Sequence, residues 1–368
     1  MSTKNVYTAN FVIPCHWDKD ILKDLMAQDS ANMGTKIFEV YGALSNGPIG
    51  HGRMPSTVPE ISNQDAESFR VYASTLGLKF AYLFNAPFSL SLDKSINNVE
   101  KYIDWVISVF EADSLVIASP ELMRFVRKLY PNIPLCISTI AGVLNASQLE
   151  KFLEFNPSRV VVHHDANRNF SELQELVSKA NEWGVEVEIM VTESCLRRCP
   201  QRESHYLHLG AGKADVAFHT VCGKRRMLYP RELLKANVIR PEEVQTYEQM
   251  GINLFKITGR SKPSAWLPEV VKAYLGRGYN GNFIRLIGID PSLKAEEWIF
   301  IDNNSLEGFL ANFPQTGIEK DENYYCDRWI SELYKHGKFR VDDGSKYLVN
   351  IAGELYCHSL GGCVSKLI

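Results

Sequence analysis

The chain has 368 residues, 45% of them hydrophobic and 23% charged, so it can bury a large core like an ordinary globular protein. Its 40 basic and 43 acidic residues give a formal net charge of -3, which disfavours nucleic acid as a partner, although a local patch could still bind it. The first residues lack a signal-peptide pattern, and no run of eighteen apolar residues occurs. We therefore expect a cytoplasmic protein with a small-molecule substrate and no membrane span.

Apolar, β-rich runs alternate with helical stretches along most of the chain. The predicted strands, in chain order, are residues 7–13, 36–44, 79–85, 114–119, 134–140, 159–164, 186–192 and 253–258. The predicted helices are residues 18–27, 65–76, 96–111, 120–130, 146–154, 170–183, 241–250 and 265–275. This alternation favours an α/β fold, a closed (β/α)8 barrel of the TIM type, over an open doubly wound sheet. A Rossmann fold is weakened further because no Gly-x-Gly-x-x-Gly follows the first strand.

The domain organisation follows from where the alternation stops. We predict a barrel over residues 1–280, with a long insertion at 196–250 after the seventh strand. Residues 281–368 form a C-terminal extension that we expect to pack on the barrel. Long insertions after a barrel strand usually carry function, so the insertion is the first place to look for a site.

Polar residues that follow the predicted strands are candidates because barrel enzymes act at the carboxyl ends of their strands. The candidate catalytic residues are Glu39, His163, Lys256 and Arg260. Glu39 is either a general acid or base or an ion-pair partner. His163 precedes His164, and two successive rings on a strand point to opposite faces, so we expect at most one of them inside the barrel.

The eighth strand ends in two cationic residues. Lys256 and Arg260 could bind an anionic group, since Gly259 lets the backbone approach closely. The alternative is a structural ion pair with Glu193.

Eight cysteines in a cytoplasmic chain point to metal binding, catalysis or burial rather than to disulfides. Cys195 and Cys199 lie four residues apart, and a proline follows the second. Two thiolates at this spacing can bind one soft metal centre, and the nearby arginines would offset their negative charge. Cys222 and Cys326 could complete four ligands. The alternative is that these thiols are buried as small hydrophobic groups. We expect burial for two others and a surface position for two in the tail: Cys15, Cys136, Cys357 and Cys363.

The segment Glu-Ser-Cys-Leu-Arg-Arg-Cys-Pro-Gln-Arg-Glu-Ser-His, at 193–205, resembles the collagenase-like peptidase family of unknown catalytic type. Gly-Ile-Asn-Leu-Phe-Lys-Ile-Thr-Gly-Arg at 251–260 and the stretch 157–168 resemble it too. The resemblance implies a barrel, and several family members carry a 4Fe-4S cluster on four cysteines and hydroxylate RNA bases or quinone precursors without oxygen. It assigns Cys195, Cys199 and Cys222 to cluster positions, with Cys326 as fourth ligand by its place in the extension.

Three functions are open at this point. The first is an iron-sulfur enzyme that carries out hydroxylation or a related redox group transfer on a small or aromatic substrate. The second is a peptidase, although no Gly-x-Ser-x-Gly and no His-Glu-x-x-His motif occurs. The third is a non-catalytic iron-sulfur subunit with a protein partner, since family members can work in pairs. The Cys-x-x-x-Cys-Pro spacing is closer than in the peptidase-type signature, so the resemblance does not supply a substrate.

Overall fold

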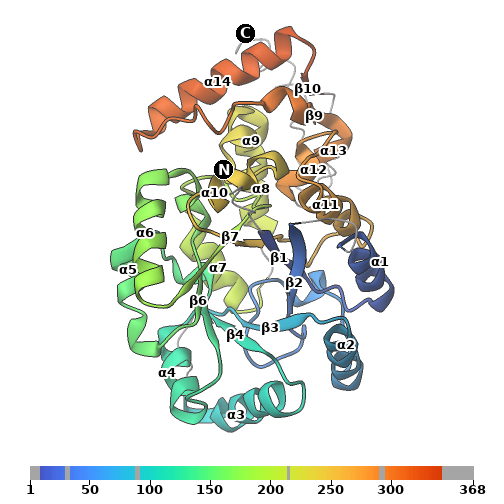
Figure 1. Ribbon diagram of the computed structural model, residues 1–368, viewed down its shortest axis with the longest axis vertical. Coiled ribbons are helices and arrows are strands. Elements are labelled where there is room, and N and C mark those ends of the chain that lie inside the picture. Colours follow the sequence, from blue (N-terminus) through green and yellow to red (C-terminus); the bar gives the residue numbers. More distant parts are fainter. Residues whose placement is uncertain (1–8, 30–33, 88–91, 214–215, 290–294, 342–368) are drawn as a thin grey trace, which may run out of the picture.

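The computed structural model describes residues 9–29, 34–87, 92–213, 216–289 and 295–341. Eight parallel strands close into a barrel in the order β1 to β8, and β8 pairs with β1 (Figure 1). The strands are β1 (Ala9–Pro14), β2 (Thr35–Gly42), β3 (Lys79–Phe84), β4 (Ser114–Ile117), β5 (Leu135–Ile137), β6 (Arg159–Val161), β7 (Glu186–Met190) and β8 (Leu254–Lys256). The predicted TIM-type barrel is confirmed.

Helices cover the outside of the barrel between successive strands (Figure 1). They are α1 (Lys19–Asp29), α2 (Asn63–Thr75), α3 (Leu92–Ser108), α4 (Pro120–Leu129), α5 (Ala146–Glu150), α6 (Phe170–Glu182), α10 (Val244–Glu248) and α11 (Trp266–Leu275). Local signals explain their starts. The Ser119 side chain caps α4 by accepting from the Leu122 amide, and Pro120 occupies the first turn. Ser62 caps α2 in the same way through the Asp65 amide.

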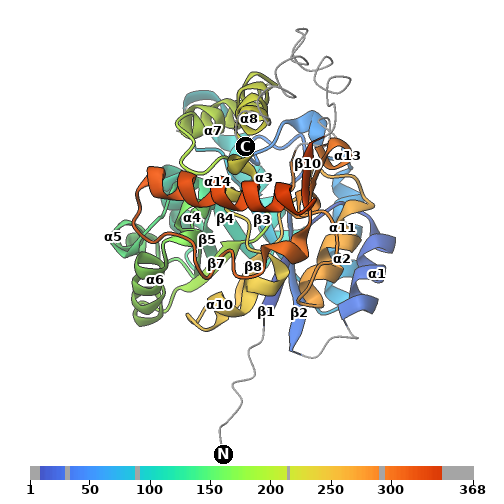
Figure 2. The same cartoon turned by 90° about the horizontal axis from the view of Figure 1, so that it is seen from above.

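Three further helices lie in the insertion between β7 and β8. They are α7 (Arg202–Gly210), α8 (Val216–Leu228) and α9 (Arg231–Lys235). The helices α7 and α8 lie side by side (Figure 2). The ring of His205 in α7 stacks on the ring of Phe218 in α8 at a centroid distance of 4.6 Å. The long insertion is thus a helical layer rather than a loop.

The chain beyond α11 forms a second layer on one side of the barrel. It contains α12 (Ile284–Ile287), α13 (Ala295–Trp298), β9 (Ile299–Ile301), α14 (Glu319–Lys335) and β10 (Phe339–Val341). Strands β9 and β10 form a small antiparallel sheet. The helix α14 packs on α9 and crosses above the strands (Figure 2). Cys357 and Cys363 lie outside the described residues.

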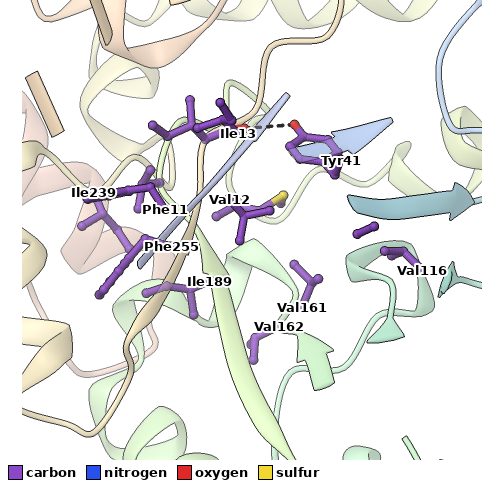
Figure 3. Packing of buried hydrophobic residues seen from close by; sticks show 14 of the residues in the cluster. Phe11, Val12, Ile13, Tyr41, Val116, Val161, Val162, Ile189, Ile239 and Phe255 are labelled. Atoms are coloured by element: carbon purple, nitrogen blue, oxygen red, sulfur yellow. Dashed lines mark hydrogen bonds between the residues drawn. The ribbon is translucent and has the colours of Figure 1, made fainter. Parts of the chain in front are cut away.

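The core is continuous from the strands to the helices that cover them. Figure 3 shows apolar side chains of β1, β2, β4, β6, β7 and β8 gathered in one cluster. Phe11 of β1 contacts Phe255 of β8 and Tyr274 of α11, with centroid distances of 5.9 and 5.7 Å. Among the described residues, no helix is both long enough and apolar enough to span a bilayer.

Candidate functional site at the barrel mouth

The cysteine segment begins directly after β7 and is held by the neighbouring strand end. Thr258, just past β8, donates its amide to the Thr192 hydroxyl at 2.8 Å. The Cys195 amide donates to the Glu193 carboxylate at 2.8 Å, which fixes the turn that carries the thiol. The chain then enters α7 at Arg202, whose amide donates to the Cys199 carbonyl at 3.3 Å. Both cysteines are therefore placed at the mouth by backbone geometry.

A single arginine connects Cys222 to this segment. The Arg226 guanidinium lies 3.4 Å from the Cys222 sulfur through Nη1, and its Nη2 donates to the Ser194 carbonyl beside Cys195. Cys195, Cys199 and Cys222 are half-buried free thiols. Arg226 thus links Cys222 of α8 to the segment of Cys195. Among the described residues, the sulfurs of Cys195, Cys199 and Cys222 do not form a group within 4.8 Å, so their shared ligand role stays a prediction.

The electrostatics of Cys195 depend on whether a metal is bound. Burial and then Glu193 raise the pKa of its thiol well above the usual value, against the charges of Arg202 and Arg226. Without a metal this thiol is neutral near pH 7, and a bound metal would replace its proton. Two arginines beside it fit a thiolate-ligated centre, because they would offset the added negative charge.

Cys326 has different surroundings. It lies on the buried face of α14, and burial raises its pKa to about 12. The charged groups that act on it are Arg168, Lys235, Glu322 and Asp327, none of which acts on Cys195. The recorded contacts therefore give no support to Cys326 as a fourth ligand, and that assignment stays a prediction.

The cysteine segment is instead tied to α14 by a buried carboxylate. Glu322 accepts from Arg197 Nε at 3.1 Å and from Arg198 Nη1 at 2.9 Å. Glu322 has no exposed surface, and Arg198 adopts a left-handed φ of 52°. Arg197 and Arg198 are the two residues between Leu196 and Cys199. Their contacts with Glu322 of α14 therefore hold the conformation of this loop.

The two histidines correct the expectation of opposite faces. The strand β6 ends at Val161, two residues before His163. His163 caps a short 3-10 helix and its ring stacks on that of His164 at 4.3 Å. Alternation along a strand does not apply beyond the strand end, which is why the expectation was wrong.

Asp165 completes a cluster with these histidines. Donor atoms of the three residues lie within 4.8 Å of one another, which is compact enough for a metal ion. Arg202, however, bonds to Asp165 and contacts His163 Nε2 at 3.2 Å. Its positive charge disfavours a cation at the same place.

Glu39 and Lys256 belong to a charge network inside the barrel. Arg159 of β6 contacts Glu39 of β2 at 2.5 Å and Glu188 of β7 at 3.1 Å. Lys256 of β8 bonds to Glu188 at 3.0 Å. Lys256 therefore forms a structural ion pair, as the alternative supposed. Its partner is Glu188 of the neighbouring strand β7, however, and not Glu193. Glu39 and Lys256 are connected by this network, while His163 lies with the cysteine segment.

Arg260, which follows β8, lies apart from that network and contacts the loop after β2. Its Nη2 donates to the His51 carbonyl at 2.6 Å, and its Nη1 lies 3.3 Å from His51 Nδ1. Gly259 has a φ of 142°, and a Cβ there would lie 2.5 Å from the Trp266 ring, so only glycine allows this approach.

Sequence reasoning missed His51 and Arg53, which join Arg260 at the mouth. The available signal was the Gly-His-Gly-Arg stretch at 50–53, which follows a predicted strand as the selected residues do. It also missed Arg159 and Glu188, charged residues within strands that otherwise read as apolar.

The fold and these residues define a (β/α)8 barrel with a thiol-rich site at the carboxyl end of its strands. Residues 39–198 match the family described as Peptidase family U32. The resemblance to the collagenase-like peptidases is therefore confirmed over these residues.

Comparison with individual proteins gives further similarities. An uncharacterized protease of Methanocaldococcus jannaschii is 26% identical over 285 residues, which cover 74% of this chain and 81% of that protein. The tRNA hydroxylation protein P of Helicobacter pylori is 24% identical over 114 residues, 30% of this chain and 27% of that protein. A solved U32 peptidase structure aligns with 14% identity and a TM-score of 0.47, over 72% of this chain and 97% of that one.

Proposed function

We propose that this protein is an iron-sulfur enzyme that catalyses an oxygen-independent hydroxylation or a related redox group transfer. The observation that carries the proposal is the placement of Cys222 beside the Cys195 segment, with Arg226 contacting both. Three thiols with arginines around them are a donor set for an iron-sulfur cluster rather than for a hard cation. Cys195, Cys199 and Cys222 would hold a 4Fe-4S cluster, which would supply redox chemistry at the barrel mouth.

One relative supports a redox reaction, whereas the other is named as an uncharacterized protease. The Helicobacter pylori relative is named for tRNA hydroxylation, and hydroxylation without oxygen needs a redox centre and a second reactant that provides the oxygen atom. A peptidase needs an activated nucleophile or a metal-bound water. Glu39, the carboxylate chosen as a possible base, contacts Arg159 inside the barrel, which leaves it poorly placed for that role.

The test is anaerobic purification followed by iron and sulfide quantitation and a visible spectrum. We expect about four irons per chain in the wild type, as in a 4Fe-4S protein. Cys195→Ala, Cys199→Ala and Cys222→Ala should each lose most of the iron. Cys136→Ala, a buried thiol inside the barrel, is the matched control and should keep it.

Cys326→Ala decides the fourth ligand. Loss of iron would make Cys326 a ligand despite its separate surroundings, and retention would leave one iron open to substrate. A folded but colourless, iron-free wild type would overturn the proposal and return attention to hydrolysis, with Glu39 and His163 as the residues to test. Full cysteine ligation without turnover would indicate a non-catalytic subunit with a protein partner.

A further inference from the structure

Two arginines at the barrel mouth, Arg53 and Arg260, have no acidic partner in the part of the chain that the structure describes. Among the described residues, no carboxylate lies within ion-pair distance of Arg53 or Arg260, whereas Arg159, Arg197 and Arg202 each have one. Arg260 is buried, with 6% of its surface exposed, and Arg53 is half-buried. Burial and then the charge of Arg53 lower the pKa of Arg260 to about 9. A buried guanidinium next to a second one is costly unless an anion joins them.

His51 supplies a third donor at the same place. An arginine can only donate, so the contact with Arg260 makes His51 Nδ1 an acceptor and leaves the ring proton on Nε2. This Nε2 is buried and has no hydrogen-bond partner within 3.5 Å among the residues described, although the Ser45 backbone lies near enough to raise the pKa of the ring. Burial, Arg260 and Arg53 lower the pKa of His51 to about 3, so the ring stays neutral near pH 7. A buried donor without a close acceptor destabilises the folded state, and a bound acceptor would remove that cost.

The position of these residues relates them to the cysteine segment. The loop that carries His51 and Arg53 follows β2, and Arg260 follows β8, the two strands that flank β1. A Cβ at Gly50 would lie 2.9 Å from the Gly210 carbonyl, so the end of α7 packs on this loop. Burial is the main cause that raises the pKa of the Tyr206 phenol of α7. Cys195 raises this pKa further and Arg53 lowers it, so the side chain is within reach of both sides.

We propose that Arg53, Arg260 and His51 bind an oxyanion group, carboxylate or phosphate, carried by the substrate. The planar guanidinium of Arg260 and the His51 Nε2–H would donate to its oxygens, and Arg53 would close the site from the more exposed side. This deepens the proposed function, because the assignment to the substrate rests on it. The anion site itself is measurable whether or not iron is present.

The experiment titrates inorganic phosphate and, separately, succinate into anaerobically purified protein at constant ionic strength, by calorimetry, with chloride as the reference anion. We expect saturable binding of at least one of the two. Arg53→Gln and Arg260→Gln should weaken it by about ten-fold or more, since each removes a charge-assisted donor. Arg124→Gln, an exposed arginine paired with Glu154, should bind like the wild type. Tighter binding of phosphate would indicate a phosphate-bearing substrate, and tighter binding of succinate a carboxylic acid.

Two results would overturn the inference: no binding beyond that of chloride, or binding that survives both substitutions. Arg260→Gln changes a buried group and needs a circular dichroism check of folding. Should it fail to fold, Arg53→Gln still decides, because Arg53 is half-buried and its recorded bond is to the Gly52 carbonyl. Iron is quantified on the same samples. Missing iron with intact anion binding contradicts the proposed function alone, and the reverse contradicts only this inference.

Discussion

The ring of His164 is fully buried, and neither of its nitrogens has a hydrogen-bond partner among the described residues. Burial, followed by the charges of Arg202, His163 and Arg197, lowers its pKa well below the usual value. Burial also lowers the pKa of His163 to about 4 and the pKa of His51 to about 3. The folded protein therefore holds three neutral histidines that the unfolded chain would protonate below pH 6.5.

This gives a stability that falls in acid. Between about pH 6.5 and 4 the unfolded state binds protons that the folded state does not, so the free energy of unfolding decreases as pH falls, by up to about 1.4 kcal/mol per pH unit for each histidine. We expect His164→Leu to reduce the loss between pH 7 and pH 5, measured by urea unfolding. His336→Leu, on an exposed residue at the end of α14, is the control. An unchanged slope in His164→Leu would contradict the assignment.

The charge network inside the barrel yields a prediction about Lys256. Removing one partner of a buried ion pair typically costs about 3 to 5 kcal/mol, because the other charge is left without compensation. Lys256→Met and Glu188→Met should each lower the free energy of unfolding by that order. The double substitution should cost less than the sum of the two, as measured by chemical denaturation of all four proteins. Strict additivity would show that the two side chains do not interact.

At the scale of elements, Glu322 gives α14 control over the cysteine segment. Glu322→Gln should destabilise the protein by about 3 kcal/mol or more and should speed the reaction of Cys195 and Cys199 with a thiol reagent, because Arg197 and Arg198 lose their shared partner. Mass spectrometry of labelled peptides measures this site by site. Glu332→Gln, on the exposed face of the same helix, should leave the labelling rates unchanged. Equal rates in Glu322→Gln would mean that other contacts hold the loop.

Element boundaries show what the sequence could and could not predict. All eight strands were found because apolar, β-branched runs are a local signal. Seven of the eight strand ends were predicted too late, as at His163 and His164, because an apolar run continues into the mouth after its ladder bonds stop. The roles of Lys256 and Glu188 depend on residues far apart in sequence, so no local pattern could assign the pair. The Cys195–Cys199 pair was selected on its spacing alone, and its role as a ligand pair stays a prediction.

At the scale of the whole molecule, buried side chains join the second layer to the barrel. Arg240 donates to the carbonyls of Asn303 and Leu306 at 3.0 and 2.7 Å. The Arg168 guanidinium lies 4.6 Å from the ring centre of Phe313. These contacts and the Glu322 pairs leave few ways for the two parts to separate without exposing buried charge.

We therefore expect one cooperative unfolding transition, although chains of this size often show several. Differential scanning calorimetry should give a single peak in the wild type, and Glu322→Gln should shift the whole peak downward. A split into two peaks in the wild type would show that residues beyond α11 unfold independently of the barrel.

The buried carboxylate of Glu322 also constrains how this protein can change over evolution. A lone substitution at 322 leaves the buried Arg197 and its neighbour Arg198 without their shared partner, and one at 197 or 198 removes one of the two cations that compensate the buried Glu322. Each is therefore selected against unless a second change accompanies it. Among relatives that have a helix equivalent to α14, these three positions should vary together, and relatives without the helix should lack both arginines. The cysteine segment would then be inherited with its distant helix as one unit, and a chimera that exchanges only one of them should fold poorly.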